Sequence, residues 1–366
     1  MLRSLLVLNK CACYDARTWE KFESLGMPPE AFMEEAPAVW SKLGITNRNM
    51  DVMKRAVSSG WAERELERCD RLGVSIITCR DANYPAPLLE IRDAPLLLYV
   101  WGSLGASAGE SIAVVGTRRC SSYASGVAKE MGARAGACGC RVVSGGAKGI
   151  DGAAHTGCLE GGGVTTAVLG TGVDQVYPVE HREMFARVRE RGALCSEYPM
   201  GSKGESWHFP RRNRIIVGLS SKVVVAEAPI KSGAMITARL AAEESREVWA
   251  VPGRIGDERC AGSNRLIFDG AMPLIDLDFL FESGSHGRQR ELFADSDAAS
   301  AGRDELRLSE NERVIASLLA RREDNTIDNL AGEAKMSAAD VFKIVSILDM
   351  RGIVFQSGSG RYRLRD

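Results

Sequence analysis

The feature that most constrains the fold is an alternation, between residues 110 and 280, of short apolar segments with helical stretches of about a dozen residues. Continuous apolar strands separated by helices are typical of a parallel sheet that is covered by helices on both faces. We therefore predict an α/β fold with a doubly wound, Rossmann-like parallel sheet. The predicted strands are 112–115, 141–144, 164–169, 193–196, 223–227 and 248–251.

The region before this alternation has a different pattern. Residues 1–75 carry apolar side chains at helical spacings, which predicts a small helical N-terminal domain. Two further strands are predicted at 75–78 and 96–100, in a short extended region. We group this region with the α/β part as one domain, 76–282.

The region after the alternation begins with a polar, small-residue segment, 283–304, which is typical of a linker. Residues 305–366 then contain three predicted helices, followed by two short strands around the Gly-tipped turn 357–360. Three helices closed by a hairpin predict a C-terminal winged helix. The predicted helices are 309–320, 326–334 and 337–350, and the predicted strands are 353–355 and 362–364.

The charge composition excludes binding to nucleic acid or membrane through bulk charge. Lys and Arg total 47 and Asp and Glu total 48, for a net charge of −1, so a polyanion site must be a local patch. The chain has no apolar run long enough to span a bilayer. Its ten cysteines lack the spacing of zinc sites, which favours reduced thiols in a cytoplasmic protein without a metal.

Glycine follows several predicted strands, together with basic residues. Because the carboxyl ends of parallel strands share one edge of a sheet, these turns should meet there, and their free amides suit anionic oxygens. The stretch 116–150 holds six basic residues against one acidic residue. We therefore predict a phosphate-binding ledge at this edge. Its turns are Gly116-Thr117-Arg118, Ser144-Gly145-Gly146-Ala147-Lys148, Gly170-Thr171-Gly172 and Ser232-Gly233.

The common phosphate ligands of such sheets are excluded by the motifs. The first turn lacks the G-x-G-x-x-G fingerprint of dinucleotide binding. Lys148 is followed by Gly149, so the Ser or Thr with which a Walker A loop holds magnesium is missing. The sequence therefore predicts neither an NAD site nor an ATP-hydrolysing site, and no cofactor.

The segment 208–216 places Phe209 beside three arginines and Asn213. An aromatic ring next to cations suits single-stranded nucleic acid, in which bases stack and phosphates pair with arginine. The alternative is that Phe209 lies in the core and the arginines cap a helix or pair with Glu197 and Glu227. Composition alone does not separate these two interpretations.

Asp151 and His155 are four residues apart on a predicted helix, so they lie on one face of it. Such a pair could bind a metal or act as a base with its orienting residue. An acid favoured by the helix N-terminus, beside a packed histidine, explains the pair equally simply. Because no third ligand is nearby, we favour this structural interpretation.

Seven motifs in one order resemble the DNA-processing protein A family (DprA, also called Smf). The resemblance covers essentially the whole chain and is strongest over 95–275. It implies an extended Rossmann domain that binds single-stranded DNA as a homodimer, displaces single-strand binding protein and helps load RecA recombinase in natural transformation. The motifs are VGTR at 115–118, VSGGAKGID at 143–151, AVLGTGVD at 167–174, FPRRNRII at 209–216, SGAMITA at 232–238, VPG at 251–253 and GSN at 262–264.

The resemblance also implies roles for individual residues. Arg118 would contact a phosphate, and Lys148 would lie beside the backbone ledge. The ledge itself would be formed by Ser144, Gly145 and Gly146, and the nucleotide pocket with its frame by Phe209, Arg212, Asn213 and Arg214.

The chain departs from the family pattern in three places. The Leu-Ala-Arg that commonly follows the Ser-Gly is Gly146-Ala147-Lys148 here, which keeps the charge but not the bidentate fork of arginine. The N-terminal domain resembles the family's sterile-alpha-motif-like region, but its first loop, 9–12, lacks the Gly-x-Gly of a DNA-gripping hairpin. The winged helix has nearly balanced charge, so we expect it to contact protein rather than duplex DNA.

The leading interpretation is a non-enzymatic, sequence-independent single-strand binder, because no nucleophile–base pair or metal cluster stands out. One alternative is a nucleotide hydrolase of the phosphoribohydrolase type with Asp151 or Glu197 as its acid. The Pro-Gly-Gly-x-Gly-Thr loop expected for that class does not occur. A second alternative is a transcription regulator acting through the winged helix.

Overall fold

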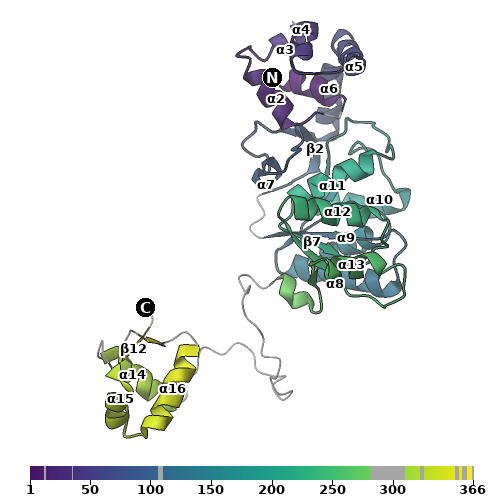
Figure 1. Ribbon diagram of the computed structural model, residues 1–366. Helices are drawn as coiled ribbons and strands as arrows, with labels where there is room; N and C mark the ends of the chain where they lie inside the picture. The colour runs from purple at the N-terminus through teal and green to yellow at the C-terminus, as the bar shows by residue number, and fades with distance from the viewer. Residues whose placement is uncertain are drawn as a thin grey trace. The chain divides into compact units, whose positions relative to one another are not determined.

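The computed structural model describes residues 1–11, 14–34, 36–105, 110–281, 310–321, 325–350, 354–356 and 361–364. They belong to two compact units, Met1–Ser285 and His286–Asp366 (Figure 1). The predicted linker 283–304 and the predicted turn 357–360 lie outside the described residues.

The first unit is built on a mixed sheet with the strand order β1-β2-β6-β5-β4-β3-β7-β8-β9. The neighbours from β6 to β9 in this order all pair in parallel, which confirms the predicted α/β class. The strands are β1 Val74–Thr78, β2 Leu97–Gly102, β3 Ser111–Val115, β4 Arg141–Ser144, β5 Thr165–Val168, β6 Ala193–Ser196, β7 Lys222–Val225, β8 Glu247–Ala250 and β9 Met272–Pro273.

Strands β1 and β2 extend this sheet at one edge. They pair with each other in antiparallel fashion, and β2 pairs antiparallel with β6. The sequence predicted both strands within the same domain as the sheet but not their pairing, because nothing local to them shows which strand they adjoin. The short strand β9 at the opposite edge was not predicted.

Helices cover both faces of the sheet, as expected for a doubly wound fold. Ile112 and Val114 point to the face covered by α8 and α9, whereas Ala113 and Val115 point to the face covered by α11 and α12. The helices of this part are α7 Ala86–Leu89, α8 Ser122–Ala137, α9 Ile150–Glu160, α10 Arg182–Arg191, α11 His208–Gly218, α12 Gly233–Glu243 and α13 Ala261–Phe268, with the 3-10 turns η1 Val179–His181 and η2 Leu277–Leu280.

The pair α8 and α9 approaches unusually closely, and glycines make this possible. A Cβ atom on Gly157 would lie 1.9 Å from the carbonyl oxygen of Lys129, and one on Gly132 would lie 2.2 Å from that of Ala154. Any side chain at these positions would force the helices apart. This contact fixes the helix whose first turn borders the ledge.

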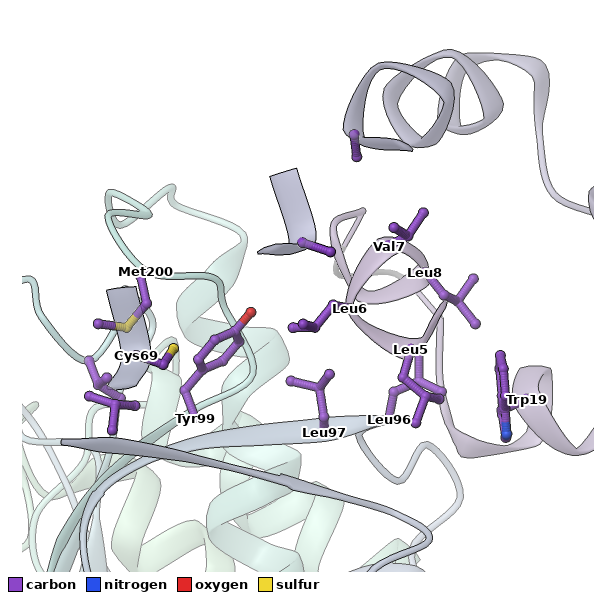
Figure 2. Close-up of a cluster of buried hydrophobic side chains, with 14 of the residues drawn as sticks. Leu5, Leu6, Val7, Leu8, Trp19, Cys69, Leu96, Leu97, Tyr99 and Met200 are labelled. Atoms are coloured by element: carbon purple, nitrogen blue, oxygen red, sulfur yellow. The ribbon is translucent and has the colours of Figure 1, made fainter. Parts of the chain in front are cut away.

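The N-terminal helices pack directly on the sheet (Figure 2). Helix α1 buries Leu5, Leu6, Val7 and Leu8 completely, against a core that includes Tyr99 of β2. The predicted helical character is confirmed, and this region shares one compact unit with the sheet. Its helices are α1 Leu2–Asn9, α2 Ala16–Glu23, α3 Ala31–Glu34, α4 Ala36–Lys42, α5 Asn47–Ser58 and α6 Trp61–Leu72.

The second unit has the arrangement of a winged helix. Three helices pack around a small core that includes Ile315, Leu330 and Val345, beside a sheet of order β10-β12-β11. Strand β10 was not predicted. The elements are α14 Glu310–Arg321, β10 Asn325–Thr326, α15 Ile327–Ala334, α16 Ala338–Met350, β11 Val354–Gln356 and β12 Arg361–Leu364. In the described parts of both units, no helix combines the length and apolar character needed to cross a bilayer.

Candidate nucleic-acid interface

A cavity of about 960 Å³ lies at the carboxyl ends of the parallel strands. The turn after β3, the start of α9, helix α11 and the N-terminus of α12 all border it, so segments far apart in the sequence meet there. Of the predicted site residues, Gly116, Thr117, Arg118, Phe209, Arg212, Asn213, Ser232 and Gly233 line this cavity.

A smaller cavity of about 70 Å³ shares Arg118, Phe209 and Arg212 with the larger one and adds Gly145 and Lys148. The two cavities form one recess over the glycine turns, which we call the ledge recess. The structure therefore brings most of the predicted ledge residues together.

Phe209 presents an aromatic surface in the ledge recess. Its ring lies 5.6 Å from that of Tyr177, centroid to centroid, with 45° between the planes. The Arg118 guanidinium carbon lies 5.6 Å from the Phe209 centroid. Glycines make room for this ring, because a Cβ atom on Gly170 would come within 2.9 Å of it and one on Gly204 within 2.8 Å. Two aromatic rings beside a cation can stack bases and pair with a phosphate.

The charge of the recess is strongly positive. The larger cavity is lined by five basic residues against one acid, Asp151, among the described residues. Arg118, Arg119 and Lys231 are exposed, whereas Lys148 pairs with Glu180 at 2.5 Å. A cationic recess of this kind in a chain of net charge −1 is the local patch that a polyanion site requires.

Asp151 and His155 have separate, structural partners. The buried Asp151 carboxylate accepts hydrogen bonds from the amides of Gly145 at 3.1 Å and Ala147 at 3.3 Å; burial raises its pKa, and Arg212 opposes that rise. His155 contacts Thr165 Oγ1 at 2.7 Å through Nδ1, and burial lowers its pKa to about 3. This arrangement agrees with the structural interpretation of the pair. The described residues contain no cluster of His, Cys, Asp and Glu that could hold a metal ion.

Arg212 supports the floor of the recess. Its Nη1 donates to the carbonyl oxygen of Gly145 at 2.8 Å and to that of Val168. Burial lowers its pKa to about 10, against the attraction of Asp151. Asn213 Nδ2 donates at 3.4 Å to the carbonyl oxygen of Gly233, which fixes the N-terminus of α12 relative to α11.

Arg214 points away from the recess into a buried ion pair with Glu197, which is 1% exposed. Arg211 lies 3.7 Å from the same carboxylate. Of the two interpretations left open by the sequence, pairing with Glu197 thus holds for Arg211 and Arg214, while Arg212 lines the cavities. The Glu227 carboxylate instead accepts two hydrogen bonds from Ser121. One comes from the Ser121 amide at 2.9 Å and the other from the Ser121 hydroxyl at 2.6 Å.

The remaining predicted site residues do not line the ledge recess, and several of them have partners within the protein. Ser144 donates its hydroxyl to the carbonyl oxygen of Val114 at 2.6 Å, and the Gly146 carbonyl oxygen lies 3.0 Å from His181 Nδ1. Gly172 donates its amide to the carbonyl oxygen of Ser202 at 2.9 Å. Contact of DNA with Ser144, Gly146, Gly170, Gly172 or Arg214 stays a prediction. None of these five is among the residues that line the recess.

Helix α6 anchors the loops next to the aromatic surface. Asp174 accepts from Arg68 Nη2 at 2.6 Å and from the amide of Gly201 at 2.8 Å. Glu65 accepts from the amide of Met200 at 2.7 Å. These contacts tie the N-terminal helices to the loop that leads to Tyr177.

The residues of the recess that the sequence analysis missed include Tyr177, Lys231 and Arg259. Tyr177 is 51% exposed and lines both cavities, but it is separated from the glycine turn by a loop without a motif. Lys231 directly precedes Ser232, so extending that turn by one residue would have found it. Arg259 comes from the segment after β8, and no local signal pointed to it.

Comparison with known proteins gives several matches. The family model of DNA recombination-mediator protein A matches residues 75–284. The putative DNA processing protein DprA of Mycobacterium tuberculosis is 34% identical over 316 residues, covering 83% of this chain and 80% of that protein. Protein Smf of Escherichia coli is 40% identical over 205 residues, covering 56% of this chain and 55% of that protein. The match to protein Smf of Synechocystis likewise covers only 56% of that relative's length.

Two solved structures extend the likeness to the fold. DNA processing protein A from Streptococcus pneumoniae is similar with a TM-score of 0.65 and 32% identity, covering 76% of this chain and 96% of that one. The protein of the same name from Helicobacter pylori, described for its single-stranded DNA binding mode, is similar with a TM-score of 0.52 and 26% identity, covering 57% and 94%. The matched family region contains the whole ledge recess, and the chain belongs to the DNA recombination-mediator protein A (DprA/Smf) family.

Proposed function

We propose that this protein binds single-stranded DNA in the ledge recess, without sequence preference. The observation that carries the proposal is the aromatic surface of Phe209 and Tyr177, flanked by Arg118 over the glycine turns. Unstacked bases can lie on these rings, and only single strands offer bases in that form. The H. pylori protein, described for its single-stranded DNA binding mode, supports the assignment.

Phosphate groups would be held by charge and by backbone amides. Arg118 and Lys231 supply exposed cations, and the N-terminus of α12 at Ser232 and Gly233 supplies amides and the positive end of a helix dipole. Space is open at Gly233, since a Cβ built there meets no atom within 4 Å. Contacts of this kind hold the strand but read no bases, so binding would be insensitive to sequence.

The cellular role that we propose rests on membership of the family. In this role the protein works in the cytoplasm during natural transformation and recombination, where it protects incoming single strands and helps load RecA. It acts as a homodimer and displaces single-strand binding protein from the strand. The relatives named DNA processing protein and the recombination-mediator family model support this assignment.

The protein acts without catalysis in this proposal. Asp151, the one acid among the described residues lining the larger cavity, accepts two backbone amides and so organises the turn. A nucleotide hydrolase would need this carboxylate to be directed at a substrate. Release of free base from nucleoside monophosphates would reveal such an enzyme, and we expect none.

The experiment that tests the proposal is fluorescence anisotropy of a labelled single strand of ~30 nucleotides against the matching duplex, over a series of salt concentrations. We expect preference for the single strand, a steep fall in affinity with salt, and collapse of binding in Arg118→Glu. Failure of the folded wild-type protein to bind the single strand would refute the proposal. A duplex preference would instead favour a regulator acting through the winged helix.

A further inference from the structure

A second cavity, of about 610 Å³, lies at the amino ends of the parallel strands, on the side of the sheet away from the ledge recess. It is bordered by the starts of β3 and β4, the end of β2 and the loop before α7. Arg141, the first residue of β4, is the one charged residue among the described residues that line it. The ledge recess lies at the carboxyl ends of β3 and β4, and this cavity lies at their amino ends. The two cavities are therefore distinct.

Arg141 is buried, and no carboxylate in the part of the chain that the structure describes pairs with it. It is 9% exposed, its Nη2 donates to the carbonyl oxygen of Gly105 at 3.3 Å, and its Nε is buried with no partner among the described residues. Glu110, next to the cavity in sequence, pairs with Lys222 at 3.0 Å instead. Burial lowers the pKa of Arg141, and no neighbouring acid opposes this.

The positive charge and the N–H donors of the Arg141 guanidinium are poorly compensated in this setting. A guanidinium carries five N–H donors in a planar fork that matches a carboxylate or a phosphate, and a buried charge without a counter-charge is costly. The hydroxyl of Ser103 reaches the same place: a Cβ atom built on Gly105 would lie 3.7 Å from Ser103 Oγ and 3.6 Å from Arg141 Nη2. The cavity thus has a cation and a hydroxyl together, and no acid lines it among the described residues.

The other walls of the cavity combine apolar side chains with the polar side chains of Ser75, Asn83 and Ser111. The apolar side chains are the part that can contact the body of a ligand. They include Ile77, Val100, Tyr84 and Leu219. We propose that this cavity binds a small organic anion, with its carboxylate or phosphate group on the Arg141 guanidinium and its apolar body against these walls. The anion supplies the counter-charge that the described residues do not provide at Arg141.

The test measures binding of small probes to the full chain by calorimetry. The probes are phenyl phosphate and benzoate, which pair an anionic group with an apolar ring, and benzyl alcohol, which has the ring without the charge. We expect one or both anions to bind and the alcohol not to bind. Arg141→Met should weaken anion binding about 10- to 100-fold, the value of a charge-assisted hydrogen bond.

Two further variants keep the test decisive. Ser75→Trp fills the cavity from an exposed position on β1 and leaves Arg141 in place. It should therefore also abolish anion binding. If Arg141→Met fails to fold, the result with Ser75→Trp tests the proposal on its own. Arg118→Ala in the ledge recess should leave anion binding unchanged. The proposal is overturned if neither anion binds at ~1 mM, if Arg141→Met and Ser75→Trp bind as wild type does, or if the loss occurs in Arg118→Ala instead.

Discussion

Replacing Phe209 by leucine should weaken single-strand binding without changing its salt dependence. Leucine keeps apolar bulk next to Gly170 and Gly204 but removes the ring face that meets Tyr177 and Arg118. Stacking of one base on an aromatic side chain contributes ~1–3 kcal/mol, so we expect affinity to fall about 5- to 150-fold. Because the side chain is uncharged, the slope of log K against log salt should stay at its wild-type value.

The assay is anisotropy of a labelled oligo-dT over a series of salt concentrations. Phe268→Leu is the matched control, because Phe268 is 79% exposed on α13 and also has an arginine near its ring, Arg265 at 5.0 Å, but does not line the ledge recess. It should bind as wild type does. Wild-type affinity in Phe209→Leu, or a changed salt slope, would refute stacking on Phe209.

Three further predictions concern single charges. Arg118→Ala should reduce the salt slope by ~0.7 and weaken binding of poly-dT and mixed sequences equally, as seen by filter binding; a loss for one sequence only would contradict this. Glu197→Ala leaves the buried Arg214 unpaired and should lower the free energy of unfolding by ~3–5 kcal/mol in urea titrations, whereas an unchanged midpoint would disprove it. For His155, whose folded pKa is about 3 against an ordinary ~6.5, the unfolded chain binds a proton that the folded chain does not. Wild-type stability should therefore fall, relative to His155→Gln, by ~1.4 kcal/mol per pH unit as pH drops below about 6.5; a pH-independent difference would exclude this.

The predicted strands at 141–144 and 193–196 coincide with β4 and β6. Their patterns are local: each strand is a short, mostly apolar run that ends at a serine. Since parallel strands place their carboxyl ends at one edge, the same patterns also predicted that Arg118 and Gly233 would meet, and the structure brings both to one cavity.

Partners across large sequence separations escaped prediction. Tyr177 comes within stacking range of Phe209, and Arg68 reaches Asp174, only after the loops and α6 have packed. For Arg214 the sequence left both alternatives open, pairing with Glu197 or facing the recess, because both environments suit an arginine.

The sequence by itself determined the α/β class, the winged helix and the turns that form the ledge, because periodicity and glycine placement act within a few residues of the chain. Only the tertiary structure decided that β1 and β2 join the main sheet and that Arg212 rather than Arg214 borders the recess. It also decided that Arg141 is buried with no acidic partner among the described residues. These outcomes depend on which distant segments share a core, and burial and pairing of charges exist only after that core has formed.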